Sequence, residues 1–218
     1  MTAALTAFPD REAAIVVEYA EKTGRYVIVR VIDEIRDWLG HPEVVMDIAQ
    51  AWSPAAKAGL LHADDTIVEA RTSISGNWSG PAATSYLTYL DHVSKVMLAT
   101  GELFDEFSGK MLDIRQHITD AYKEAIGIIG NTGAEILSMT GGIVAGAKEL
   151  LFGVADAVLE ALANFLRLIT STAQNIVQIM TDFQRSGLEL AQRAADLQIP
   201  EALPSVVADS GNWKAGSA

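Results

Sequence analysis

Six prolines divide this chain, and their positions limit where long helices can form. None falls between Ala82 and Ile199, and an interior proline would cost a helix about 3 kcal/mol. This proline-free stretch carries two apolar stripes at three-four spacing, which predicts two long amphipathic helices. The first stripe comprises Ala83, Tyr86, Leu90, Val93, Met97, Phe104, Phe107, Met111, Ile114, Ile118 and Ala121, and the second comprises Val158, Leu162, Phe165, Ile169, Ile176, Ile179, Phe183 and Leu190.

A further periodic segment, residues 42–74, precedes this stretch and includes Trp52 on its apolar face. Ser53 and Pro54 interrupt the segment. A serine followed by a proline favours a helix start, so we expect a kink or a restart there. Residues 75–81 are dense in turn-forming residues, and Pro81 is placed to open the next helix. Two amphipathic helices joined by so short a turn are expected to fold back as an antiparallel hairpin.

A glycine-rich patch follows the first long stripe. Gly130 to Gly133 is expected to end one helix, since glycine just past the last turn is the usual C-cap. Beyond it small residues recur every fourth position, and Gly142 and Gly146 would let a neighbouring helix approach closely. Two interpretations stay open for this ridge. It packs tightly within the bundle, or it belongs to a helix that inserts into a membrane after a conformational change.

The two ends of the chain differ from the middle in sequence pattern and composition. Residues 13–32 fit two short strands around a turn, because Val and Ile dominate them. They also fit helices, with Ile28, Val31, Ile35 and Trp38 on one face. We prefer helices because everything downstream is helical. From Pro200 small residues and prolines predominate, which predicts a flexible tail.

Composition and motifs exclude several function classes. The chain has 218 residues, of which 50% are hydrophobic, and a net charge of -12. It is too apolar for a disordered chain and too acidic for nucleic acid, which needs clustered lysine and arginine. It has no cysteine, its histidines lack the spacing of a helical zinc site, and it has no phosphate loop or nucleophile elbow. We therefore expect no enzymatic activity, no metal site and no cofactor.

Two features of the sequence bear on targeting. The first residues lack the basic start and apolar core of a Sec-type signal peptide. The apolar zone from Ile126 to Met180 is broken by charged residues, so no uncharged run reaches the roughly 18 to 20 residues that spanning requires. The chain is therefore expected to have no cleaved leader and no transmembrane helix. The interrupting charges are Glu135, Lys148, Glu149, Asp156, Glu160 and Arg167.

The turn residues carry a resemblance to a known family. Trp78-Ser79-Gly80-Pro81 and the following alanines, after a helix that contains Trp52, resemble the hairpin of the Trp-Xaa-Gly (WXG) family. Members of that family are small helical substrates of the type VII (ESX) secretion system of actinobacteria and firmicutes. The resemblance covers about residues 42–128. It implies an antiparallel hairpin, dimerisation into a four-helix bundle and export without a cleaved leader, as for the longer ESX-secreted proteins that add helices after the hairpin.

One family feature is missing from this chain. Type VII substrates commonly carry Tyr-Xaa-Xaa-Xaa-Asp/Glu just beyond the hairpin, and no tyrosine here has an acidic residue four positions later. A partner supplies the signal, the machinery reads a degenerate form, or the chain is not exported. The expected location is the cell surface or the medium, or the cytoplasm if the signal is truly absent.

These observations predict an all-α protein, an elongated antiparallel helical hairpin with a second long helical unit. The expected segments are a helical N-terminal segment at 1–40, the hairpin at 41–128, the second helical unit at 129–199 and the flexible tail at 200–218. Trp78, Gly80 and Pro81 form the turn, and the seam or interface residues are Trp52, Tyr86, Leu90, Val93 and Met97.

The expected role is that of a non-enzymatic type VII substrate. It would bind another helical protein, as a heterodimer or homodimer, through coiled-coil-like packing, and it would contact the secretion machinery. Two alternatives stay open. The first is a membrane-active helical protein that exposes residues 134–166 to lipid, and the second is a delivery partner of a separate toxin.

Overall fold

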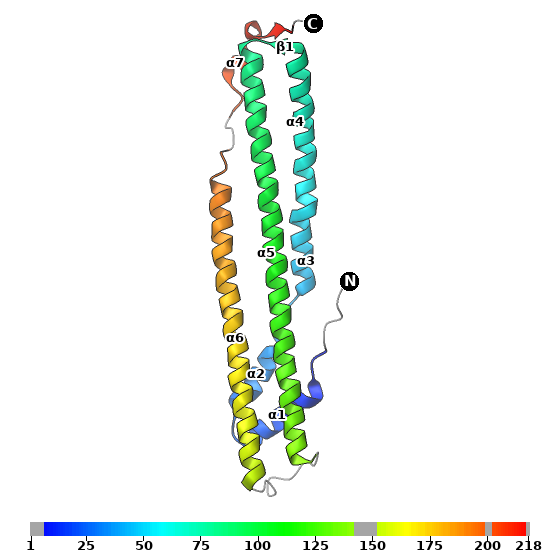
Figure 1. Ribbon diagram of the computed structural model, residues 1–218, viewed down its shortest axis with the longest axis vertical. Coiled ribbons are helices and arrows are strands. Elements are labelled where there is room, and N and C mark those ends of the chain that lie inside the picture. The colour runs from blue at the N-terminus through cyan, green and yellow to red at the C-terminus, as the bar shows by residue number, and fades with distance from the viewer. Residues whose placement is uncertain (1–6, 142–151, 199–201, 217–218) are drawn as a thin grey trace. The chain divides into compact units, whose positions relative to one another are not determined.

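A computed structural model describes residues 7–141, 152–198 and 202–216 of the chain. The fold is all-α, as the sequence predicts (Figure 1). Its strands are two residues long each and form one antiparallel pair. The elements in chain order are α1 (Asp10–Lys22), α2 (Tyr26–Asp37), α3 (Pro42–Gln50), η1 (Ala51–Ala56), α4 (Lys57–Asn77), β1 (Trp78–Ser79), α5 (Pro81–Thr140), α6 (Phe152–Ala195), α7 (Ser205–Ala208), η2 (Ser210–Asn212) and β2 (Lys214–Ala215).

The chain divides into two compact units, and both long helices contribute to each. The core unit consists of Met1–Pro42 and Asp113–Asp182, and the hairpin unit consists of Glu43–Leu112 and Phe183–Ala218. Helix α5 has 60 residues and is about 90 Å long at the usual rise per residue. Its N-terminal half belongs to the hairpin unit and its C-terminal half to the core unit.

The core unit holds a continuous hydrophobic core. Residues 1–40 contribute α1 and α2, so the helical alternative for this segment is the one that the structure has, from Asp10 onward. Three isoleucines of α2, Ile28, Ile32 and Ile35, are completely buried at helical spacing. From α5 and α6 the core receives Tyr122, Ala125, Ile126, Ile129, Ile136, Val158, Ala161, Leu162, Phe165 and Ile169.

Helix α5 does not end where the glycines predicted. The expectation that Gly130 to Gly133 ends a helix is wrong, because α5 continues to Thr140. The glycine that ends it is Gly141, whose φ is +66°. Gly133 serves another purpose, since α1 crosses α5 there at a distance that leaves no room for a side chain. Gly142 and Gly146, the predicted close-packing pair, lie outside the described residues.

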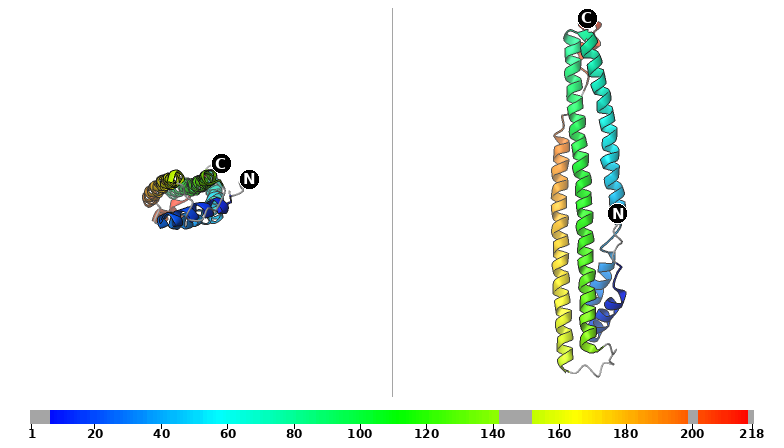
Figure 2. Two further views of the ribbon diagram at one scale, coloured as in Figure 1. Left: turned by 90° about the horizontal axis from the view of Figure 1, so that it is seen from below. Right: turned by 45° about the vertical axis from the view of Figure 1, so that its right-hand side comes forward.

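The hairpin unit contains the predicted antiparallel hairpin. Side-chain contacts between α4 and α5 show that these two helices are antiparallel. Arg71 lies 2.5 Å from Asp91, Ser94 donates a hydrogen bond of 2.5 Å to Asp64, and Lys57 forms an ion pair with Asp105. As the residue number falls on one helix, it rises on the other. Figures 1 and 2 show α4 and the N-terminal half of α5 side by side in both directions of view.

The hairpin's first helix bends at the predicted position. Ser53 has non-helical backbone angles, with φ of −139° and ψ of 124°, between α3 and α4. Its side chain does not cap the following helix. It donates instead to Asp105 on α5, over 2.6 Å. The bend is therefore tied to the opposite helix of the hairpin.

The described part of residues 200–218, for which the sequence predicts a flexible tail, contains short elements of regular structure. Residues 202–216 include α7, η2 and β2, and β2 pairs with β1 at the hairpin turn. Figure 1 shows β2 beside β1 at the hairpin turn. Pro204 is the N-cap residue of α7.

Candidate protein-interaction site

The seam of the hairpin is only partly buried. None of the 21 residues of α4 is buried. Of the predicted seam residues on α5, Leu90 is buried, whereas Tyr86, Val93 and Met97 are half-buried. The largest fully buried side chains of the described residues all lie in the core unit, among them Phe165 and Leu162. The hairpin unit thus lacks a comparable core of its own.

Helix α4 also exposes an apolar stripe beside the seam. Leu61 and Val68 are 42% and 45% exposed, and they lie seven residues apart, which places them on one face of the helix. We call these two residues the outer stripe. Leu60 and Ile67, one position earlier in each case, are half-buried. The apolar surface of α4 is therefore wider than the strip that α5 covers.

An aromatic cluster marks the bend between α3 and α4. The ring of Trp52 lies edge-on to Phe104 and Phe107, with centroid distances of 5.0 and 5.3 Å. Trp52 is still 40% exposed, so one side of its indole faces solvent. The predicted interface residue Trp52 therefore has both a packing contact within the hairpin and free apolar surface.

Asp105 lies between Phe104 and Phe107 on α5 and makes polar contacts with Ser53 and Lys57 at the same bend. The hydrogen bond from the Lys57 ammonium, then the one from the Ser53 hydroxyl, hold the pKa of the Asp105 carboxyl below its ordinary value. Next to it on α5, Glu106 forms an ion pair with Arg193 of α6. Residues 104–107 thus hold both the bend and the end of α6 against α5.

The turn residues meet the C-terminal segment, which we define as residues 204–216. Trp78 pairs with Ala215 and Ser79 pairs with Lys214 in the β1–β2 ladder. The Trp213 ring lies 5.8 Å from that of Trp78 and 6.2 Å from that of Tyr86, both in T-shaped geometry. The predicted turn residue Pro81 is the first residue of α5.

Gly80 is required at this turn for two reasons. Its φ is +94°, which side-chain-bearing residues rarely adopt, and a β-carbon would lie 2.9 Å from the carbonyl oxygen of Asn212. The close approach is therefore one of backbone to backbone. Gly80, the glycine of the Trp-Xaa-Gly motif, therefore permits both the turn and the close packing of the C-terminal segment against it.

The two segments that meet at this contact share a short internal repeat, which hydrophobic periodicity does not reveal. The tetrapeptide Ser-Gly-Asn-Trp occurs at residues 75–78 and again at residues 210–213. The structure brings the two copies together at the hairpin turn, where the N–H of Gly216 also donates to the carbonyl of Asn77 over 2.7 Å. A search for short internal repeats would have linked the two segments.

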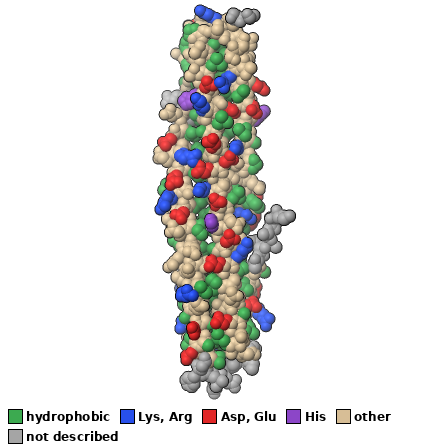
Figure 3. All heavy atoms as spheres, in the orientation of Figure 1, with side chains coloured by type: hydrophobic (Ala, Val, Ile, Leu, Met, Phe, Trp, Pro, Cys, Tyr) green, Lys and Arg blue, Asp and Glu red, His purple; other side chains and the backbone are tan. Residues whose placement is uncertain are grey.

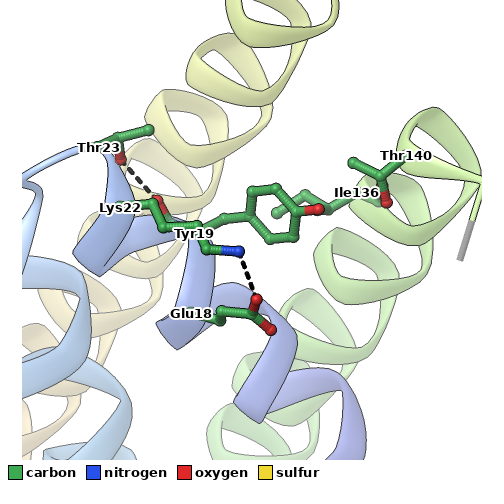
Figure 4. A network of polar contacts seen from close by, with 6 residues as sticks. All are labelled: Glu18, Tyr19, Lys22, Thr23, Ile136 and Thr140. Carbon is green, nitrogen blue, oxygen red and sulfur yellow. Dashed lines mark hydrogen bonds and ion pairs between the residues drawn. The ribbon is translucent and has the colours of Figure 1, made fainter. Parts of the chain in front are cut away.

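The core unit contains one polar group that stands out. The hydroxyl of Tyr19 is buried and has no hydrogen-bond partner among the described residues. Figure 4 shows it beside Ile136 and Thr140 of α5. Thr140 donates to the carbonyl of Ile136 over 2.9 Å, and the Lys22 ammonium lies 5.0 Å from the centroid of the Tyr19 ring. The ring packs as a core residue.

Charged groups do not gather into one cluster on the face that Figure 3 draws. Figure 3 shows acidic, basic and hydrophobic side chains interspersed over the face in view. Within the described ranges, no cluster of three or more histidine, aspartate or glutamate residues could hold a metal ion. Also within those ranges, no helix combines the length and the apolar character needed to cross a membrane.

The described features are those of an all-α protein with a helical hairpin and a covered turn. No family model, no curated protein and no solved structure matches the chain.

Proposed function

We propose that this chain is a non-enzymatic type VII secretion substrate that acts by binding another helical protein through its hairpin unit. The observation that carries the proposal is the absence of any buried residue in α4. A helix of this length in a finished bundle buries an apolar face against its neighbours. In this structure the apolar face of α4 packs against α5, and the outer stripe beside that face is exposed to solvent.

A helical partner fits this surface for physical reasons. The exposed apolar residues follow helical spacing, which suits a partner helix laid along the outer stripe of α4. A second hairpin would complete a four-helix arrangement and remove the outer stripe from water. Each apolar side chain covered in this way contributes on the order of 1.5–3 kcal/mol at full burial. The partner is therefore expected to be helical and to bring an apolar face.

The export role rests on the resemblance of the turn to the Trp-Xaa-Gly family and on the missing acidic signal. Since no tyrosine of this chain is followed by an acidic residue at the fourth position, the partner supplies that signal. Binding and export are then coupled: the chain leaves the cell together with the protein that covers its hairpin.

Native mass spectrometry of the tagged chain purified from its own cells tests the partner. The expected species is a one-to-one complex with a small helical protein that carries Tyr-Xaa-Xaa-Xaa-Asp/Glu. The double variant Leu61→Glu/Val68→Glu should lose this complex, because it places two carboxylates on the outer stripe. The control is Thr66→Glu/Ser73→Glu, which adds two exposed carboxylates at the same spacing on another face of α4. A purely homomeric wild-type preparation would overturn the proposal.

Export is tested separately in an actinobacterial host. The tagged chain, expressed with its partner, should reach the medium in a strain with an intact type VII system and stay in cells that lack the system. The Leu61→Glu/Val68→Glu chain should be retained in both strains. Equal amounts of wild-type chain in the two media would contradict the export role and leave partner binding intact.

A further inference from the structure

The C-terminal segment has a fold that its own contacts maintain. The Trp213 indole N–H donates to the carbonyl of Val207 over 2.9 Å, and the Gly211 amide donates to Asp209 over the same distance. Asn212 also donates to Asp209, over 3.2 Å. These bonds lie within residues 204–216 and constrain the Trp213 ring in addition to its contacts with the hairpin. The segment therefore behaves as a small preformed ligand.

The hairpin turn forms a docking site for this segment, which we call the seat. It contributes the ladder pairs of β1, the rings of Trp78 and Tyr86, and the side-chain-free surface of Gly80 against the Asn212 carbonyl. An extended peptide that is bound at a strand edge gains affinity from main-chain hydrogen bonds and specificity from the side chains that it places against the partner. The seat belongs to the hairpin itself, whose two helices are paired by Arg71 with Asp91 and by Ser94 with Asp64.

The contact between seat and segment is shallow. The paired strands are two residues long, and Trp78 stays 45% exposed with the segment in place. Elements with few buried contacts open without global unfolding. Opening this contact would leave the rings of Trp78, Tyr86 and Trp213 without their aromatic partners, so an open chain gains by covering them again.

We propose that the hairpin turn is a docking site for the C-terminal segment and that it accepts this segment from a second copy of the chain, forming a dimer by exchange. Every second copy carries the same segment and the same seat, so the complementarity within one chain is also complementarity between two. Within one chain the segment competes at a high effective concentration, which keeps the exchange rare until the contact opens. This inference concerns the turn and does not depend on the partner proposed for the outer stripe.

Two full-length variants test the exchange by complementation. Trp213→Ala has an intact seat and a defective segment, and Trp78→Ala has a defective seat and an intact segment. Each variant alone should be monomeric in light scattering and native mass spectrometry. An equal mixture should form a one-to-one heterodimer, with at least a tenfold larger dimer fraction than either variant alone. The control mixture of Trp213→Ala with Trp52→Ala should stay monomeric, because the Trp52→Ala chain keeps its own segment docked.

A labelled synthetic peptide of residues 204–216 provides a second measurement. It should bind the Trp213→Ala chain saturably and bind the wild type at least tenfold more weakly, since the wild-type seat is occupied. The same peptide with alanine at the tryptophan position should not bind. Far-UV circular dichroism verifies that the variants keep wild-type helicity. A helical Trp213→Ala chain that binds neither the peptide nor the Trp78→Ala chain would overturn the proposal.

Discussion

Gly133 of α5 and Glu12 of α1 lie in backbone contact in the core unit. A β-carbon on Gly133 would stand 2.7 Å from the carbonyl oxygen of Glu12 and 2.8 Å from its α-carbon. These atoms belong to the main chain of a helix, so they cannot move aside as the end of a flexible side chain would. The crossing of α1 over α5 therefore depends on the missing side chain at residue 133.

Replacing Gly133 with alanine should lower the free energy of unfolding. The new methyl group forces α1 away from α5, and overpacking of this kind costs typically 1–3 kcal/mol. The gain in helix propensity, about 1 kcal/mol, offsets part of that cost. Urea unfolding followed by circular dichroism measures the difference.

Gly127 provides the matched control for this substitution. It lies on the same helix, and a β-carbon there would meet nothing within 4 Å. Gly127→Ala should therefore raise the stability by up to about 1 kcal/mol through helix propensity alone. Equal effects of the two substitutions would show that the crossing does not depend on Gly133.

The carboxyl of Asp105 should titrate differently in variants of its two partners. Lys57→Met should raise the pKa of Asp105 toward its ordinary value, and Ser53→Ala should raise it by less, because the Lys57 hydrogen bond is the larger cause of the lowered pKa. Carboxyl-detected NMR titration measures both. The opposite order of the two variants would contradict this assignment of causes.

The same lowered pKa sets the direction of a pH effect on stability. A carboxyl whose pKa is lower in the folded state stabilises that state above its unfolded pKa. The contribution is lost as pH falls through the folded pKa. The wild type should therefore lose more stability on acidification than the Lys57→Met chain does. Thermal unfolding between neutral and acidic pH compares the two chains.

Local periodicity was enough to predict the hairpin, since the stripe through Leu90 and the turn at Trp78 are each encoded within a few residues. The end of α5 was not predictable in this way. Glycine at residues 130 and 133 reads as a helix stop, and its actual use at 133 depends on the approach of α1, more than a hundred residues earlier in the chain. Propensity was overridden by a tertiary contact.

Of the candidate site, local periodicity could likewise predict single residues but not the contacts between distant ones. Trp52, Tyr86 and Trp78 could be chosen because they lie on the stripes or in the turn. The docking of Trp213 on Trp78 joins residues that are far apart in the sequence, and hydrophobic periodicity carries no information about such pairs. Likewise, the pairing of Ser53 with Asp105 becomes visible only once the register of the hairpin is known.

The ring contact between Trp52 and Phe104 should appear as an energetic coupling. Trp52→Ala, Phe104→Ala and the double variant form a double-mutant cycle, and T-shaped aromatic pairs are typically coupled by about 0.5–1.5 kcal/mol. The control cycle combines Trp52→Ala with Tyr86→Ala. Tyr86 lies 18 residues before Phe104 on α5, roughly 27 Å along the helix, so those two effects should add. Urea unfolding of each variant gives the free energy of unfolding. If the effects add in both cycles, the contact between Trp52 and Phe104 does not stabilise the hairpin.

Removal of the Tyr19 hydroxyl should leave the core unit as stable as before or make it more stable. This buried oxygen has no hydrogen-bond partner among the described residues, and a buried polar group without one costs about 1–3 kcal/mol. Tyr19→Phe keeps the ring between α1 and α5 while removing that cost, so the free energy of unfolding should stay level or rise by roughly 1 kcal/mol. Tyr19→Ala is the comparison, and it should lower that free energy by about 3 kcal/mol because it empties the same space. Urea unfolding distinguishes the two, and a Tyr19→Phe chain as unstable as the alanine variant would mean that the hydroxyl is bonded in the folded protein.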